Sequence, residues 1–168
     1  MHDTLSASHD AWLVLLSYLL AALASYAALD LVARAWLARG RARQAWLGAG
    51  AVAMGIGIWG MHFLGMLAFQ PHGPHGAPLR VGYDVPLVAL SIVVAIVASA
   101  LALRAGVRDT LRPRELLGAG TLMAAAIAGM HYIGMAAMRM AATVHYDPAL
   151  VLASLAIAFA ASIAALWI

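Results

Sequence analysis

The feature of this sequence that most constrains its fold is a series of long apolar segments separated by short polar ones. A helix needs about 20 mostly apolar residues to cross the hydrocarbon core of a membrane. Five segments have that length, and they lie at residues 11–33, 48–69, 85–103, 117–138 and 148–168. Since only helices and closed barrels span lipid, these lengths predict an all-α, polytopic transmembrane helix bundle with five spans.

The composition agrees with a membrane protein and excludes several other classes. Hydrophobic residues make up 65% of the 168 residues and charged residues only 10%, whereas a soluble domain is about half apolar and about a quarter charged. The chain contains no Cys, which excludes a disulfide framework and a thiolate metal site. The pI of about 9.8 comes from Arg in short loops, so we do not expect nucleic acid as a partner.

The arginines predict the orientation of the chain. Eight of the ten lie in the connections after the first and third apolar segments, and these are Arg34, Arg39, Arg41, Arg43, Arg104, Arg108, Arg112 and Arg114. Because Arg-rich loops stay in the cytoplasm, we expect the N-terminus outside. The seven His then fall in outer segments or in the outer turns of spans, at positions 2, 9, 62, 72, 75, 131 and 145. This placement points to chemistry at the outer face.

A seven-residue motif occurs twice within the apolar segments. Residues 60–66 are GMHFLGM and residues 129–135 are GMHYIGM, so five of the seven positions are identical. A polar residue inside a span is costly and is by default a functional candidate. Repetition in the same context favours function over an isolated His that only bonds to a carbonyl.

A second repeat marks the other three apolar segments. Each carries Asp, then Leu three residues later and Ser seven and fifteen residues later, as in Asp10/Leu13/Ser17/Ser25, Asp84/Leu87/Ser91/Ser99 and Asp147/Leu150/Ser154/Ser162. At about 3.6 residues per turn, both Ser lie on nearly the same helix face as the Asp. Small residues on one face favour close helix packing in lipid.

The two patterns together predict repeated helix pairs within one domain at residues 1–168. An inward helix with Asp and Ser is followed by an outward helix that ends in the His motif. The first pair covers about 9–69 and the second about 83–138. A third pair begins at about 146 and lacks its second helix, so we expect this chain to be a piece of a longer protein with a third motif soon after residue 168.

Each motif places an imidazole beside a thioether, because Met follows His by four residues on the same helix face. The Met directly before each His points about 100° away and is a weaker candidate. Imidazole with thioether suits copper, whereas zinc prefers His, Cys and carboxylate. The predicted ligands of a copper ion are therefore, in this order, His62, Met66, His131, Met135, Met61 and Met130.

Other interpretations stay open at this point. Two His on different helices are able to ligate a haem, and room for a flat cofactor would come from Gly55, Gly57, Gly60 and Gly65. A metal transporter or chaperone would need polar groups toward the cytoplasmic side, where there is little beyond Ser25, Asp30, Ser99 and Ser162. A purely structural module would use the His in hydrogen bonds and the Gly in packing. The repeated Asp residues are candidates to orient an imidazole.

The two motifs, the helices that begin with Tyr-Asp and the outer placement of His resemble the MHYT domain of bacterial membrane sensors over nearly the whole chain. The resemblance implies a module with three motif copies, fused through its last span to cytoplasmic cyclic-di-GMP synthesis and breakdown domains or to other outputs. It also implies sensing of oxygen, carbon monoxide or nitric oxide through copper, held here by the His and Met of the motifs. The chain departs from that pattern at Phe63, where the second motif has Tyr132, and in lacking the third copy.

We accordingly expect a sensory input module in the bacterial inner membrane, responding to a diatomic gas or to redox state, with no enzyme activity within these residues. The expected partners are the lipid bilayer, the gas and cytoplasmic cyclic-di-GMP domains, and a homo-oligomer is left open. Outside the motifs, we expect His9 and His145 to be interface residues first and accessory ligands second. His72 and His75 lie in the Gly/Pro-rich stretch PHGPHG, which we expect to be an exposed flexible loop, with delivery of a metal to the membrane site as the alternative.

Overall fold

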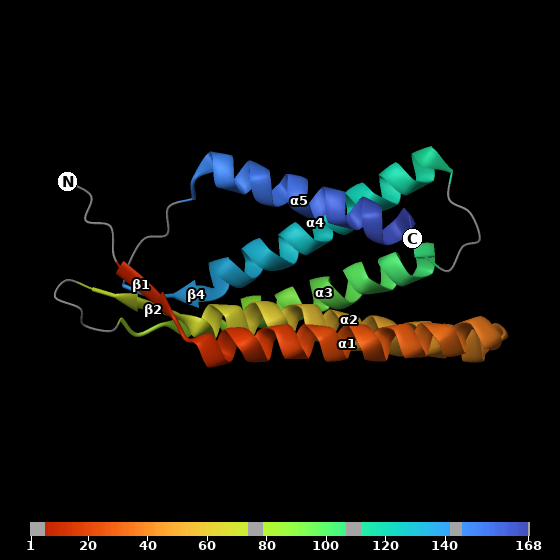
Figure 1. The fold of residues 1–168 in the computed structure, drawn as a ribbon, viewed down its shortest axis with the longest axis horizontal. Coiled ribbons are helices and arrows are strands. Elements are labelled where there is room, and N and C mark those ends of the chain that lie inside the picture. Colours follow the sequence, from red (N-terminus) through yellow and green to blue (C-terminus); the bar gives the residue numbers. More distant parts are fainter. Residues whose placement is uncertain (1–5, 74–78, 107–111, 142–145, 168) are drawn as a thin grey trace.

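Five helices run back and forth along one axis (Figure 1). The computed structural model describes residues 6–73, 79–106, 112–141 and 146–167. The helices are α1 (Ala11–Leu37), α2 (Gly40–Ala68), α3 (Val85–Gly106), α4 (Pro113–Ala137) and α5 (Pro148–Trp167). Each helix packs on the next along the chain, and the most extensive contact is between α1 and α2. The prediction of an all-α bundle of contacting helix pairs is confirmed.

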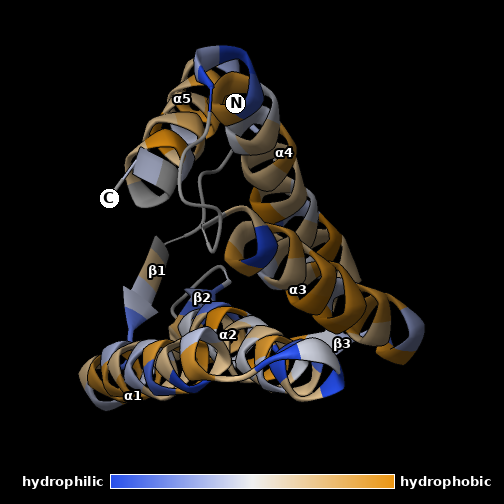
Figure 2. Cartoon of the chain, turned by 90° about the vertical axis from the view of Figure 1, so that its right-hand side faces the viewer, coloured by the Kyte–Doolittle hydropathy of each residue, from blue (hydrophilic) through white to orange (hydrophobic). Residues whose placement is uncertain are grey.

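Four helices within the described residues, α1 to α4, are long and apolar enough to cross a membrane. The fifth, α5, is a shorter apolar helix, so the prediction of five full spans is supported for four. Large apolar side chains are exposed on the outward faces, among them Leu23 and Leu29 of α1 and Leu150 and Ile157 of α5. Figure 2 shows hydrophobic colour over the outward sides of all the helices. Water disfavours such a surface, and lipid covers it in a membrane protein.

The helices extend beyond the predicted spans, most of all between the first two. The spans predicted at 11–33 and 48–69 left a long polar connection, but α1 continues to Leu37 and α2 begins at Gly40. The prediction was wrong there because Arg and Gln are good helix formers and stay helical outside the apolar core. Gly40 has a φ of 58°, a left-handed conformation that favours glycine and allows this tight reversal.

The repeated Asp is the N-cap of its helix. A carboxylate oxygen of Asp10 accepts hydrogen bonds from the backbone N–H groups of Trp12 and Leu13 at 2.9 and 3.1 Å. The carboxylates of Asp84 and Asp147 accept equivalent bonds at the starts of α3 and α5. The repeated Leu is the third helical residue, whose N–H a capping side chain satisfies. Capping therefore accounts for the constant Asp–Leu spacing.

Two short antiparallel ribbons, which the sequence did not predict, lie at the end of the bundle that carries the His motifs (Figure 1). Their strands are β1 (Ser6–His9), β2 (Phe69–His72), β3 (Gly82–Tyr83) and β4 (Met138–Arg139). In both ribbons, β1–β2 and β3–β4, the strand before an Asp helix pairs with the strand after the motif helix that follows. The N–H of Asp10 donates to the carbonyl of Ala68 at 2.9 Å, and the N–H of Asp84 to that of Ala137 at 2.8 Å. The two helix pairs thus close in the same way.

Glycines set the close approach between neighbouring helices. A Cβ on Gly55 would stand 2.7 Å from a backbone nitrogen of α3. Gly57 and Gly60 face Ala24 and Leu20 of α1 in the same manner. The neighbouring helix fills the space that these glycines would have left for a flat cofactor. Their role is close helix packing.

The Ser face of the Asp helices is largely buried, as the spacing predicted. Four of these residues are less than a tenth exposed, and they are Ser17, Ser91, Ser99 and Ser162. Each of their hydroxyls donates to a backbone carbonyl three or four residues earlier in its own helix. The face therefore packs closely without leaving a hydroxyl proton unpaired.

Candidate metal centre

The two motif helices bring their His side chains together. His62 comes from α2 and His131 from α4, and their ring centroids lie 4.7 Å apart with an angle of 56° between the ring planes. The helices α2 and α4 touch over only a short stretch. Residues 69 positions apart in the sequence are thus neighbours at the point where these helices meet.

One nitrogen of the His62 ring lacks a hydrogen-bond partner. Its Nε2 is buried, and no described residue bonds to it. Leaving a buried polar atom unpaired costs about 1–3 kcal/mol, and native proteins rarely do so without a functional reason. A neutral imidazole nitrogen is the commonest protein ligand of metal ions, so a metal is a natural partner for this atom.

Gly134 of the second motif faces the imidazole of the first. A Cβ built on Gly134 would stand 2.8 Å from Nε2 of His62 and 3.7 Å from Cε of Met66. The absence of a side chain at this position therefore lets the imidazole of His62 pack directly against α4, with the methyl group of Met66 nearby. Gly65, the equivalent residue of the first motif, has no atom within 4 Å of its own Cβ position.

The predicted ligands differ in their surroundings. Met66 is 6% exposed, and its methyl group lies close to Gly134 together with His62. Met135 is half-buried on α4. Met130 is buried, whereas Met61 is 36% exposed. The structure thus brings together the two His and Met66, and it does not bring Met61 into this group.

The described residues contain no group of three or more His, Cys, Asp or Glu that could hold a metal ion. A metal at this place would therefore depend on two imidazoles and a thioether. That donor set suits copper, since thioether sulfur favours Cu(I) and imidazole serves both copper states. The unpaired Nε2 of His62, the neighbouring imidazole of His131 and the thioether of Met66 fit such an ion.

Aromatic side chains, which sequence reasoning did not assign to the site, surround the two His. The Phe63 ring stacks on Trp59 at 5.0 Å and lies 4.9 Å from the ring of Tyr83. On the other side, the Tyr132 ring lies 5.0 Å from that of His131 and 5.8 Å from that of Tyr146. Burial raises the pKa of Tyr83. The aromatic residues beside each motif were the available signal, and the ring of Tyr132 contacts the imidazole of His131.

Comparison with known families decides the relationship. The family model described as the N-terminal repeat of bacterial signalling proteins, MHYT, matches residues 55–119 and 125–168. These two segments cover well over half of the chain, and each begins a few residues before a His motif. The chain belongs to the MHYT family. It is a membrane domain with the repeated sensory element of that family.

Several curated proteins resemble this MHYT domain along almost its whole length. The bifunctional diguanylate cyclase/cyclic di-GMP phosphodiesterase MucR of Pseudomonas aeruginosa is 46% identical over 164 residues, which is 98% of this chain and 23% of that protein. The cyclic di-GMP phosphodiesterase NbdA of the same organism is 41% identical over 92% of this chain and 19% of its own length. The signaling protein YkoW of Bacillus subtilis is 36% identical over 95% of this chain and 19% of its own length. The chain spans about a fifth of these relatives. No solved structure matches it.

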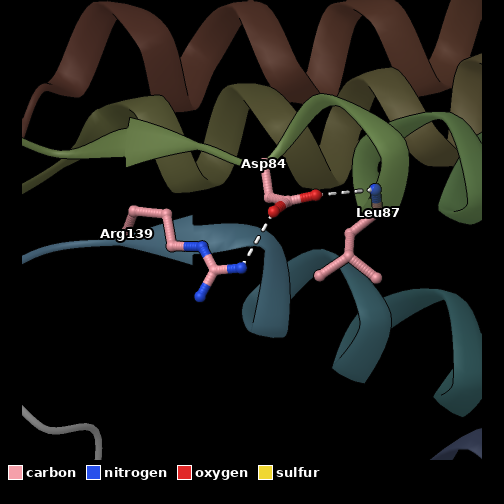
Figure 3. A network of polar contacts seen from close by, with 3 residues as sticks. All are labelled: Asp84, Leu87 and Arg139. Carbon is pink, nitrogen blue, oxygen red and sulfur yellow. Dashed lines mark hydrogen bonds and ion pairs between the residues drawn. The ribbon is translucent and has the colours of Figure 1, made fainter.

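The repeated Asp residues of the MHYT domain hold helix ends. Asp84 accepts hydrogen bonds from the N–H of Leu87 and from the guanidinium of Arg139, the latter at 2.8 Å (Figure 3). The Arg139 bond, followed by the Leu87 bond, lowers the pKa of this carboxyl, which lies outside the spans. The prediction that these Asp residues orient an imidazole is not supported, because their carboxylates accept hydrogen bonds from helix N-termini and, at Asp84, from Arg139.

The remaining His residues lie apart from the imidazole pair. His9, at the end of β1, contacts the ring of Phe69 edge-on with centroids 5.7 Å apart. His72 ends β2, opposite Ser6. His75 and His145 lie outside the described residues. His9 and His72 thus belong to the first ribbon, and His72, which we expected in a loop, is the last residue of β2.

Proposed function

We propose that this MHYT domain is a membrane input module that binds a copper ion near the outer face and responds to a diatomic gas or to redox state. The observation that carries the proposal is the buried, unpartnered Nε2 of His62, which faces Gly134 and lies beside His131 and Met66. Such a nitrogen, bordered by a second imidazole and a thioether, is the arrangement expected of a soft metal site.

Each residue of the proposed site would have a separate role. His62 and His131 would supply imidazole nitrogens, and Met66 the thioether, while Gly134 lets the His62 ring lie directly against α4. A copper ion, once bound, supplies a centre that changes redox state and accepts a small neutral ligand such as oxygen, carbon monoxide or nitric oxide.

The output of the full protein follows from its relatives. Two of them are named for cyclic-di-GMP synthesis or breakdown, and this chain corresponds to only a part of each. We infer that cytoplasmic cyclic-di-GMP domains receive the signal in this protein as well, and that α4 and α5 carry it inward. A signal needs two helix arrangements that differ in their affinity for the ligand. Catalysis would take place in those domains.

Metal content is the test of this function. The protein is purified in detergent after copper loading, and copper, iron and zinc are quantified with an optical spectrum. We expect one copper per chain in the parent and loss of most of it in the variant with His62→Ala and His131→Ala. The matched control carries His9→Ala and His72→Ala, which removes two imidazoles from the ribbon and keeps the copper.

Two outcomes contradict the proposal. Equal copper in the parent and the variant lacking both motif His would mean that the ion binds elsewhere. An intense Soret band with stoichiometric iron would show that the protein binds haem instead of copper.

A further inference from the structure

Each motif helix is hydrogen-bonded to the next Asp helix through an aromatic side chain. The indole Nε1–H of Trp59 on α2 donates to Oγ of Ser91 on α3 at 3.1 Å. The hydroxyl of Tyr132 on α4 lies 3.0 Å from Oγ of Ser154 on α5. Ser91 and Ser154 are the same position of the repeat, seven residues after the capping Asp. The two bonds are therefore equivalent elements of the repeated fold.

The serine is the acceptor in both bonds. The hydroxyls of Ser91 and Ser154 donate to the carbonyls of Val88 and Val151 in their own helices, at 2.7 and 2.8 Å. A hydroxyl has a single proton and two lone pairs, so that proton is already engaged and only the lone pairs stay free. An indole is a donor only, and Tyr132 must donate as well.

The two motifs supply this donor from different positions. In the first motif the residue after His is Phe63, which has no donor, and the indole of Trp59 one turn earlier provides it. In the second motif the residue that corresponds to Trp59 is Ala128, and the phenol of Tyr132 provides the donor. One aromatic donor per motif is kept although its place in the sequence changes, which points to a common task.

We propose that Trp59 and Tyr132 are positioning residues that orient His62 and His131 for the metal. Tyr132 adjoins His131 and its ring contacts the imidazole, and Trp59 lies one helical turn before His62. A hydrogen bond to the neighbouring helix limits rotation of the motif helix about its axis, and that rotation determines where the imidazole points. This inference rests on the proposed metal binding.

The two bonds differ in their surroundings. The Tyr132–Ser154 bond lies six residues into α5 and is exposed on the surface of the helix bundle. The Trp59–Ser91 bond is part-buried between α2 and α3. Both bonds are thus placed to hold neighbouring helices in register.

Copper affinity tests the second motif first. Affinity for Cu(I) is measured by competition with a chelator for the parent, Tyr132→Phe, Ser154→Ala and the double variant, in detergent. We expect each single variant to bind about threefold to tenfold more weakly, the range of one net hydrogen bond. The double variant should lose no more than either single variant, because both changes break the same bond. The variants should also alter the copper hyperfine splitting in the electron paramagnetic resonance spectrum of the Cu(II) form.

Trp59→Phe and Ser91→Ala repeat the test for the first motif. Ser17→Ala is the matched control, because Ser17 holds the same repeat position and donates to the carbonyl of Val14 at 2.7 Å. In the described part of the chain no aromatic side chain donates to it, so its removal should leave copper affinity unchanged.

The outcomes separate positioning from a purely structural role. Variants that lower thermal stability but keep the parent's copper affinity and spectrum would overturn the positioning role and leave the proposed function standing. Additive losses in the double variant would do the same. A parent that binds no copper would overturn the proposed function, and this inference with it.

Discussion

At the scale of single residues, the two motif glycines form a matched pair. Gly134 and Gly65 hold equivalent positions, but a Cβ on Gly134 would meet Nε2 of His62 at 2.8 Å while one on Gly65 would meet nothing within 4 Å. The first imidazole therefore faces the glycine of the second motif and not its own. Both glycines are visible in the repeated motif, but the sequence could not predict this asymmetry, which depends on how α2 and α4 are rotated against each other.

Gly134→Ala should weaken copper binding without removing any donor atom. Overpacking costs about 1–3 kcal/mol, so we expect a loss of about tenfold in affinity, measured by chelator competition. Gly65→Ala should bind copper as the parent does, and it should unfold at a slightly higher temperature because Ala favours helix by up to about 1 kcal/mol. Copper affinity equal to that of the parent in both variants would mean that the contact of His62 with Gly134 does not matter for the site.

Residue roles differ in how far the sequence reveals them. Repetition singled out His62 and His131, and the structure brings them together, although their role as metal ligands stays a prediction. Met61 and Met130 look alike in sequence, yet one is exposed and the other buried. The donors Trp59 and Tyr132 were visible as aromatic residues near each motif. Their partners were not, because they lie on another helix.

At the scale of secondary-structure elements, an Asp cap fixes the start of the first helix in each pair, and a ribbon joins that start to the end of the second helix. The Asp–Leu spacing was visible in the sequence, and its explanation as an N-cap followed only from the structure. The ribbons escaped prediction because β3 and β4 contain only two residues each, too few for an alternating pattern. The ion pair of Asp84 and Arg139 joins the start of α3 to β4.

This ion pair predicts a pH dependence of stability. Because the pKa of Asp84 is lowered in the folded protein, its contribution is complete above the ordinary pKa of Asp and is lost as the pH falls through the lowered value. The thermal unfolding temperature of the parent should therefore fall more steeply as the pH is lowered than that of Asp84→Asn or Arg139→Gln. High salt should reduce the difference, since the Arg139 side chain is 65% exposed and salt screens exposed charges. Identical acid profiles for all three proteins would show that the pair contributes nothing.

At the scale of the whole molecule, the repeated helix pair organises the domain. The apolar segments predicted the helices and their order, and the two repeated patterns, the His motif and the Asp–Leu–Ser–Ser spacing, predicted which helices are alike. They also placed His62 and His131 at one copper ion, but they could not predict how α2 and α4 approach each other there, because glycines such as Gly55 and Gly57 set the packing against neighbouring helices. The end with both ribbons is also the end with both motifs (Figure 1).

The central claim, that His62, His131 and Met66 hold one copper ion, is tested most directly by X-ray absorption at the copper edge of the Cu(I)-loaded protein. The account predicts scattering from imidazole nitrogens and from sulfur in the parent. Met66→Leu should lose the sulfur contribution and keep the imidazoles. Met61→Leu, a control at a 36% exposed position, should retain both. A parent spectrum without sulfur, or sulfur that persists in Met66→Leu and disappears in Met61→Leu, would contradict the assignment.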